Sequence, residues 1–218
     1  MGMLKEVKTQ TIGEEIANSI SHGVGAGLSV AALVLLTVRA VSVKSGGLGV
    51  VSASIYGGSL VLLYLLSCLY HALAKTRARK VFQILDHCSI FILIVGTYTP
   101  IALNFIGGAL GWTIFGIQAG CMVLGIVFNA INMEKWKKAS LILYVIMGWL
   151  IVISVKSILA FPPAALWFLV LGGVSYTVGI IFYKNKNKNL KFFHFIWHIF
   201  VLGGSVLHFF CVYFYVFK

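Results

Sequence analysis

GALGWTIFGIQAGCMVLGIVFNAI, residues 108–131, is a run of 24 residues without one charged side chain. An α-helix rises about 1.5 Å per residue, so a helix of this length crosses the roughly 30 Å hydrocarbon core of a membrane. Six further apolar stretches of similar length flank this run, at residues 17–38, 49–73, 84–105, 140–159, 164–183 and 192–217. The sequence therefore predicts an all-α integral membrane protein. We expect one seven-transmembrane-helix bundle over residues 1–218, with residues 1–16 as a short cytoplasmic segment.

The composition of the chain argues against a soluble protein. Of its 218 residues, 60% are hydrophobic and 10% are charged, whereas soluble domains carry about 25% charged residues. A net charge of +12 can indicate nucleic-acid binding in a polar chain. In a chain this apolar, the basic excess indicates loops on the cytoplasmic side of a membrane. We therefore expect no nucleic-acid partner, and neither a cytosolic enzyme nor a secreted factor.

The basic residues predict the orientation of the bundle. With the N-terminus in the cytoplasm, 13 lysines and arginines lie inside and four lie outside, in agreement with the positive-inside rule. The inner set is Lys5, Lys8, Lys75, Arg77, Arg79, Lys80, Lys135, Lys137, Lys138, Lys184, Lys186, Lys188 and Lys191. The outer set is Arg39, Lys44, Lys156 and Lys218. We expect a cytoplasmic N-terminus and an external C-terminus in a cell membrane, with the lysine and asparagine run at 184–189 as a solvated loop.

Ionisable residues inside membrane spans are costly, which makes each of them a candidate for function. All six histidines lie in or at the edge of predicted spans: His22, His71, His87, His194, His198 and His208. Under the predicted topology, five of them and Asp86 fall near the cytoplasmic ends of four different spans. Only His208 lies deeper, about 15 Å from His198 along the helix axis. Chance placement along seven spans does not produce such a convergence.

The histidine spacing indicates a metal site. His194 and His198 stand four residues apart, on one face of a helix, and two imidazoles at this spacing bind a single zinc in helical metal sites. His71, from another span at the same leaflet, is the third candidate ligand. Three histidines leave one tetrahedral position for water, which is the arrangement of catalytic zinc sites. Zinc suits imidazole ligands and needs no redox chemistry.

Two polar neighbours are candidate catalytic residues. Asp86 could hold or deprotonate the water, and Ser67, one turn before His71, could hydrogen-bond a ligand, the water or a developing oxyanion. Both residues also have a structural interpretation. Asp86 opens a predicted helix, where a carboxylate meets the positive end of the helix dipole. The Ser67 hydroxyl can bond to the carbonyl four residues before it.

A second polar stripe lies on the first span. Glu15, Asn18 and His22 stand at positions i, i+3 and i+7, within one helical face. They either contact the metal ligands and orient them, or form a cap network at the start of the helix. We favour the first alternative, because His22 lies too deep in the span to serve only as a cap.

Together these residues resemble the progestin and adipoQ receptor superfamily, in its bacterial haemolysin III branch. The matching motifs are EIANSISH at 15–22, SCLYH at 67–71, DHCSI at 86–90, HFIWH at 194–198 and HF at 208–209. The resemblance covers essentially the whole chain. It implies a seven-helix fold in a bacterial plasma membrane, with a cytoplasmic N-terminus and zinc held by His71, His194 and His198. It also implies a zinc-bound water in contact with Asp86.

The resemblance and the residues leave several functions open. The first is a zinc-dependent hydrolase of a lipid amide or ester at the cytoplasmic leaflet, since eukaryotic relatives are linked to ceramidase-type hydrolysis. The second is a non-enzymatic regulator of membrane homeostasis with a structural zinc, and the third is a cytolytic protein, which only the name of the branch suggests. An ion carrier is disfavoured, because Asp86 alone forms no path through the membrane. We expect a membrane lipid as substrate or ligand, and the sequence defines neither a protein partner nor an oligomeric state.

Overall fold

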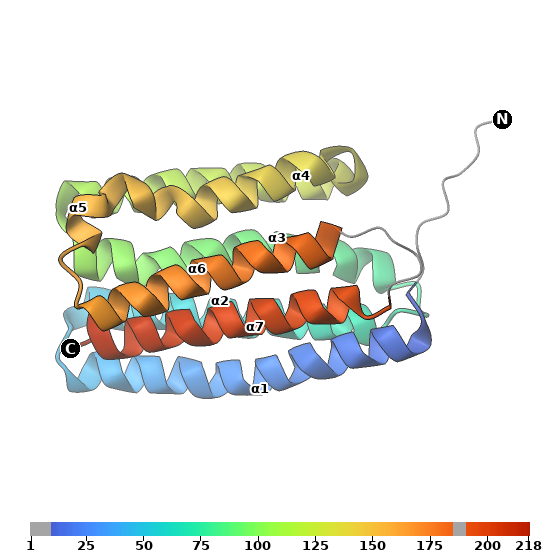
Figure 1. The fold of residues 1–218 in the computed structure, drawn as a ribbon, viewed down its shortest axis with the longest axis horizontal. Coiled ribbons are helices and arrows are strands. Elements are labelled where there is room, and N and C mark those ends of the chain that lie inside the picture. The colour runs from blue at the N-terminus through green and yellow to red at the C-terminus, as the bar shows by residue number, and fades with distance from the viewer. Residues whose placement is uncertain (1–9, 185–190) are drawn as a thin grey trace.

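A computed structural model describes residues 10–184 and 191–218 of the chain, and within these ranges every regular element is a helix (Figure 1). The long helices are α1 (Ile12–Ser42), α2 (Gly46–Ala72), α3 (Arg79–Pro100), α4 (Gly108–Trp149), α6 (Pro163–Lys184) and α7 (Phe193–Cys211). The shorter elements are η1 (Ile101–Ile106), η2 (Leu150–Ser154), α5 (Val155–Ile158) and η3 (Val212–Val216). The predictions for Lys5, Lys8 and most of the run at 184–189, Lys186 and Lys188 included, fall outside the described residues.

Six helical segments of the described chain are long and apolar enough to cross a membrane. The predicted all-α membrane fold is thus confirmed. One of the six, Gly108–Ile158, covers the predicted span 108–131 and all but the last residue of the predicted span 140–159. We expected two separate helices joined by a loop. In the structure the second helix follows the first directly, with a break at a single residue.

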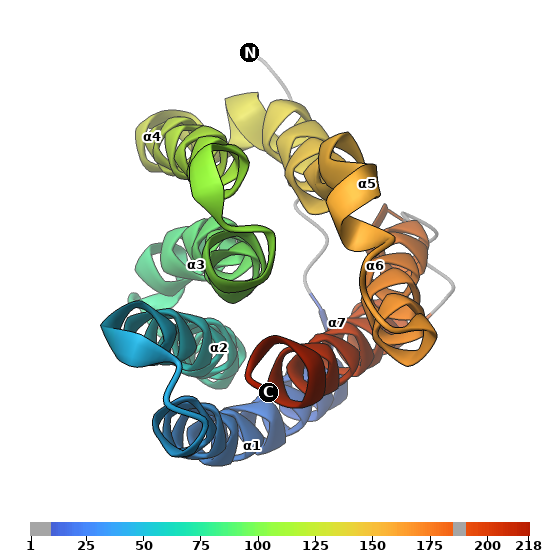
Figure 2. The ribbon, with the colours of Figure 1, turned by 90° about the vertical axis from the view of Figure 1, so that its left-hand side faces the viewer.

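That break is at Asn132, whose φ of −160° and ψ of 88° are not helical. Its side-chain oxygen accepts a hydrogen bond from the backbone N–H of Lys135 at 3.0 Å, which is how an asparagine caps the start of a helix. The second arm of α4 therefore begins here and folds back beside the first. Gln118 on the first arm donates to the carbonyl of Met147 on the second at 2.8 Å. α4 is consequently a helical hairpin (Figure 2).

Two helices begin earlier than the apolar pattern predicted. α1 begins at Ile12 rather than at residue 17, because Thr11 and Glu14 form a reciprocal capping box that holds a polar first turn. α3 begins at Arg79 rather than at residue 84. Asp86 therefore lies about two turns inside α3. The structural interpretation of Asp86 as a residue at the positive end of a helix was wrong.

The two faces of α1 differ sharply in polarity. Its outer face carries apolar residues at four-residue spacing, each more than half exposed: Ile12, Ile16, Ile20, Val24 and Leu28. Its inner face buries Glu15, Asn18 and His22. In a membrane the apolar stripe faces lipid, while the polar stripe points into the bundle. The amphipathic pattern of this one helix therefore delivers charged and polar groups to the interior.

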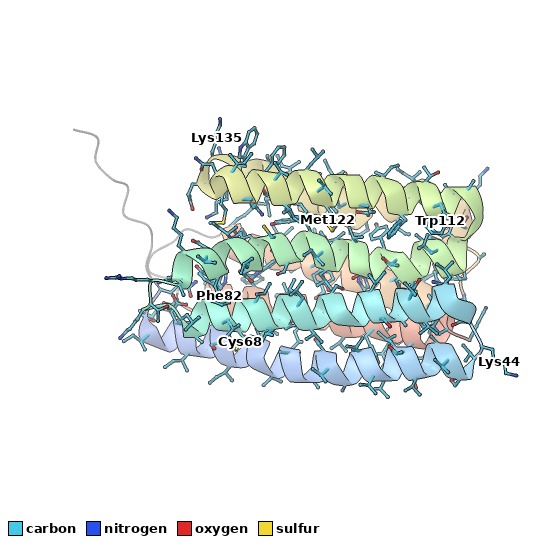
Figure 3. All side chains as sticks on the ribbon, turned by 180° about the vertical axis from the view of Figure 1, so that it is seen from behind. Lys44, Cys68, Phe82, Trp112, Met122 and Lys135 are labelled. Atoms are coloured by element: carbon cyan, nitrogen blue, oxygen red, sulfur yellow. The ribbon has the colours of Figure 1, made fainter. Side chains whose placement is uncertain are left out.

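The helices form a ring when the bundle is viewed from its end (Figure 2). Neighbours in sequence pack side by side, α1 on α2, α2 on α3, α3 on α4 and α6 on α7, and α7 closes the ring against α1. α4 touches α6 only slightly. Lys135 and Lys44 lie at opposite ends of the bundle (Figure 3), as do the start of α1 and the C-terminus (Figure 1).

Candidate metal centre

Three histidines meet at the end of the bundle where α1 begins. His71 lies near the end of α2, and His194 and His198 lie on the first turns of α7. One ring nitrogen from each lies within 4.8 Å of the other two. His71 and His198 are almost fully buried, each residue 2% exposed. The structure thus brings together all three residues that the sequence singled out as ligands.

The chemistry of this group fits a metal ion. Nε2 of His71 is buried and has no hydrogen-bond partner among the described residues, and such a lone pair is costly in a protein interior unless it binds something. Nitrogens around a tetrahedral metal with bonds of about 2.0–2.1 Å stand about 3.4 Å apart. Ring rotations that move each nitrogen by roughly an ångström therefore close the group around one ion.

The ring of His71 is fixed from behind by a carboxylate. Its Nδ1 donates to Oε2 of Glu15 at 2.6 Å, which leaves the lone pair of Nε2 free to bind a metal. The other oxygen of Glu15 accepts from Arg79 at 2.5 Å. The cap of α1 is made by Thr11 and Glu14 instead. Glu15 thus bonds to His71 and Arg79, and its carboxylate takes no part in the cap.

His198 is fixed by a serine of α1. The hydroxyl of Ser21 donates to the carbonyl of Asn18 at 2.8 Å, so its oxygen is left to accept from Nδ1 of His198, at 3.1 Å. The ring of His22 stacks on that of His198, with centroids 3.5 Å apart. The side chain of Asn18 donates to Gln10 at 2.6 Å. The polar stripe of α1 therefore contacts two of the three ligand rings.

Two of these orienting residues escaped the sequence analysis. Arg79 was counted only as a cytoplasmic charge, and nothing in its neighbourhood in the sequence links it to Glu15. Ser21 carried a usable signal, because it stands three residues after Asn18 and is therefore its neighbour on the helix surface.

Asp86 and Ser67 lie in a cavity of about 150 Å³ that also reaches His194 and His198. Ser67 lies close to the Asp86 carboxylate, and Nδ1 of His87 stands 3.6 Å from it. Asp86 does not belong to the group of mutually close ligand atoms found in the described chain, which consists of the three histidines. The two candidate catalytic residues thus share a chamber with the candidate ligands.

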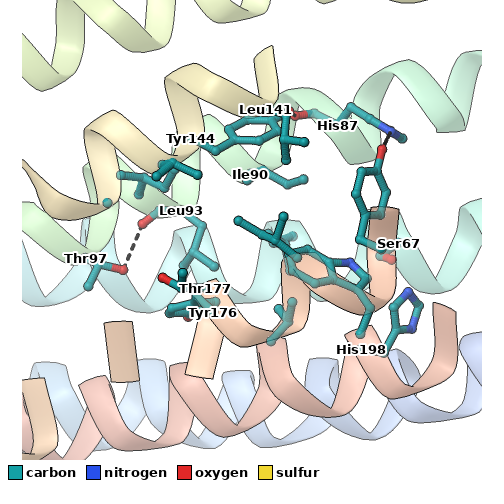
Figure 4. Close-up of a pocket in the computed structure, with 18 of the residues that line it drawn as sticks. Ser67, His87, Ile90, Leu93, Thr97, Leu141, Tyr144, Tyr176, Thr177 and His198 are labelled. Atoms are coloured by element: carbon teal, nitrogen blue, oxygen red, sulfur yellow. Dashed lines mark hydrogen bonds between the residues drawn. The ribbon is translucent and has the colours of Figure 1, made fainter. Parts of the chain in front are cut away.

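The cavity is largely apolar away from this end (Figure 4). Its middle is lined by aliphatic residues of α3 and of the second arm of α4, among them Ile90, Leu93 and Leu141. Tyr183 closes one side, with its hydroxyl 3.4 Å from Nε2 of His87. A chamber with polar groups at one end and aliphatic walls beyond it suits a molecule with a polar head and a hydrocarbon chain.

The fold and the site define a multi-pass helical membrane protein with a buried histidine group that could hold a metal ion. The chain belongs to the haemolysin III family: the family model described as "Haemolysin-III related" matches residues 10–209. The resemblance noted from the motifs is thereby confirmed, and the protein is placed in the cell membrane.

Relatives of known name cover nearly the whole chain. Hemolysin-3 of Bacillus cereus is 44% identical over 209 residues, which are 95% of this chain and 94% of that protein. The hemolysin-3 homolog of Bacillus subtilis (strain 168) is also 44% identical over 209 residues, 95% of this chain and 97% of the homolog. The monocyte to macrophage differentiation factor of Homo sapiens is 28% identical over 180 residues, 77% of this chain and 71% of the human protein. The family is thus related to mammalian proteins of the progestin and adipoQ receptor type.

Proposed function

We propose that this protein is a zinc-dependent hydrolase that cleaves an amide or ester bond of a membrane lipid. One observation carries the proposal: three imidazoles converge at the polar end of an aliphatic cavity that also contains a carboxylate and a hydroxyl, Asp86 and Ser67. Ligands, a proton acceptor and room for a hydrocarbon chain are the parts that lipid hydrolysis requires.

Each residue has a chemical role in this proposal. Zinc held by His71, His194 and His198 would supply the Lewis acidity that activates water and polarises a carbonyl. Asp86 accepts the proton of the attacking water at a carboxylate oxygen. The hydroxyl of Ser67 donates a hydrogen bond to Asp86 or to the developing oxyanion. The aliphatic walls bind the acyl chain and keep bulk water away.

The proposal includes a topology of seven spans in one domain over residues 1–218, with a cytoplasmic N-terminus. Each arm of the α4 hairpin is long enough to count as a span, which raises the six apolar segments to seven. An odd number of spans agrees with the start of α1 and the C-terminus at opposite ends of the bundle (Figure 1). The histidine group then lies at the cytoplasmic leaflet, as the positive-inside rule requires.

A second candidate is a non-enzymatic regulator, or a cytolytic protein, in which zinc is structural. The contacts of the ligand rings support it, because Glu15 and Ser21 link them to α1. A bound ion would then join α1, α2 and α7 and stabilise the bundle. The names of the two Bacillus relatives favour the cytolytic version.

The deciding experiment is lipid-product analysis of the purified protein in lipid nanodiscs. We expect mass spectrometry to detect fatty acid released from a ceramide or ester substrate, to find less after treatment with a zinc chelator, and to find it again after zinc is restored. Release that persists at full rate in metal-free protein would contradict the zinc mechanism. If no lipid amide or ester in a panel yields a product, the hydrolase proposal is wrong and the candidate with a structural zinc is favoured.

A further inference from the structure

A second polar cluster lies at the far end of the cavity, about 15 Å along α7 from His198. Tyr176, Thr97 and His208 line the cavity there. Figure 4 shows Tyr176 and Thr97 at the end opposite to Ser67 and His198, with aliphatic residues between the two ends. The metal centre uses none of these groups, and together they form a buried set of hydrogen-bonding side chains in the middle of an apolar bundle.

The hydroxyls of Tyr64, Tyr176 and Ser205 have more protons than the hydrogen bonds between them use. Tyr64 donates to Oγ of Ser205 at 2.7 Å, and the same oxygen lies 2.7 Å from the hydroxyl of Tyr176. Three hydroxyls carry three protons, and these two bonds use two of them. A third contact, from Tyr64 to the carbonyl of Val201 at 3.3 Å, can only share the proton that Tyr64 already donates. One O–H group is therefore left to donate, and of Tyr176 and Ser205 it is Tyr176 that lines the cavity.

His208 supplies the complementary acceptor. Its Nε2 lies 3.1 Å from the carbonyl of Leu169 and must donate to it, so Nδ1 carries a lone pair. This Nδ1 is buried and has no hydrogen-bond partner among the described residues. The cluster thus offers both a donor and an acceptor that the described chain does not satisfy.

We propose that this cluster is a second binding site, which takes a hydroxyl group on the hydrocarbon chain of a lipid. The inference rests on the proposed function in one respect, that the ligand of the cavity is a lipid. A hydroxyl both donates and accepts, so it matches the two unused groups, whereas a methyl end would leave them unpaired at a cost in affinity. A charged group is disfavoured, because Asp86 is the only Asp, Glu, Lys or Arg among the described residues that line the cavity, and it lies at the other end.

The test compares two acids in zinc-loaded protein in lipid nanodiscs: dodecanoic acid and ω-hydroxydodecanoic acid. Their extended chains span roughly the 15 Å between the two polar ends. We expect the hydroxylated acid to bind roughly 3- to 10-fold more tightly, which is the net worth of one hydrogen bond. Displacement of a fluorescent fatty acid measures both dissociation constants without any turnover.

Variants then assign the preference to the cluster. Tyr176→Phe and His208→Gln should each bring the ratio of the two dissociation constants close to one while dodecanoic acid still binds. Tyr215→Phe, the same change on η3 outside the cavity, should keep the wild-type ratio. Equal binding of the two acids by the wild type would overturn the proposal, as would binding of neither acid or an unchanged ratio in both cluster variants. A clear preference in a protein that hydrolyses no lipid would support this site and count against the hydrolase instead.

Discussion

Oε2 of Glu15 lies 2.6 Å from Nδ1 of His71, so a carboxylate at the start of α1 fixes the ring of a histidine at the end of α2. Such a partner holds one tautomer, keeps the other ring nitrogen free for a metal and makes the ring a stronger ligand. Arg79 holds the second oxygen of Glu15 and thereby fixes the carboxylate itself. Its side chain is 31% exposed, so this chain of contacts runs from the surface of the bundle to the ligand.

Replacing Glu15 by glutamine should weaken zinc binding without unfolding the protein. The amide keeps the shape of the side chain but loses the charge that orients His71, and loss of such a partner typically costs 10- to 100-fold in metal affinity. Competition with a chromophoric chelator measures the affinity. Glu134→Gln removes the same charge from the arm of α4 and serves as the control. An unchanged affinity in Glu15→Gln would show that the contact does not support a metal.

Removal of a ligand should remove the metal itself. We expect about one zinc per chain in the wild type, and His71→Ala, His194→Ala and His198→Ala should each reduce that content sharply. His208→Ala should keep it, because Nε2 of His208 is bonded to Leu169 on α6, far from the group. Elemental analysis of the purified variants checks this. Full zinc content in all three ligand variants would refute the site.

The sequence predicted most of the fold because membrane spans are defined by one property, an apolar length. All seven predicted apolar stretches are helical along most of their length in the described chain. The errors lie at helix ends. The Thr11–Glu14 capping box extends α1 into polar sequence, and Asn132 reverses the chain in a single residue, whereas hydropathy alone predicted a loop. Caps are local hydrogen bonds, and hydropathy averaged over twenty residues does not detect them.

For the candidate site, the sequence predicted the three histidines but not the residues that contact them. The convergence of His71, His194 and His198 followed from span direction and helical spacing alone. The contacts of Ser21 and Arg79 did not, because they depend on the rotation of α1 relative to α2 and α7, which the apolar pattern leaves open. The far cluster around Ser205 was missed for a related reason: serine and tyrosine are common in spans, and only the packed structure shows that the hydroxyls of Tyr64 and Tyr176 both meet the oxygen of Ser205.

The packing of α1 on α2 should depend on a glycine. A Cβ added at Gly57 would lie 2.5 Å from the backbone Cα of Leu33, and a helix backbone cannot move aside as a side chain can. Gly57→Ala should therefore destabilise the fold by about 1–3 kcal/mol and lower the unfolding temperature. Gly58→Ala is the matched control, since its Cβ meets nothing within 4 Å. Equal unfolding temperatures for the two variants would refute the close contact.

The orientation can be tested by labelling in intact cells. In a background with the native cysteines replaced by serine, a membrane-impermeant maleimide should label Lys44→Cys, between α1 and α2, and leave Arg77→Cys unlabelled until the cells are opened. The two positions precede and follow α2, so they must lie on opposite sides of the membrane if α2 crosses it. Labelling of Arg77→Cys from outside would reverse the topology and move the histidine group to the outer leaflet.

Asp86 distinguishes a catalytic zinc from a structural one. If the carboxylate were itself a ligand, it would bind zinc directly at about 2.0–2.2 Å, and the site would be closed. If it acts as a base, it contacts the ion through water and stands roughly 4 Å or more away. The second arrangement agrees with a group of mutually close ligand atoms that consists of three histidines and with Asp86 in the adjoining cavity beside Ser67.

Asp86→Asn should therefore keep zinc and thermal stability but lose hydrolysis. Asparagine is nearly the same size as aspartate, yet it cannot accept the proton of the attacking water, and loss of a general base typically costs 10²- to 10⁴-fold in rate. Zinc content, unfolding temperature and lipid-product release, measured on one preparation, give the three readouts. Loss of zinc together with stability would make Asp86 a ligand of a closed, structural site. Retention of both zinc and full hydrolysis would exclude Asp86 as the base, because the proton would then pass to another group.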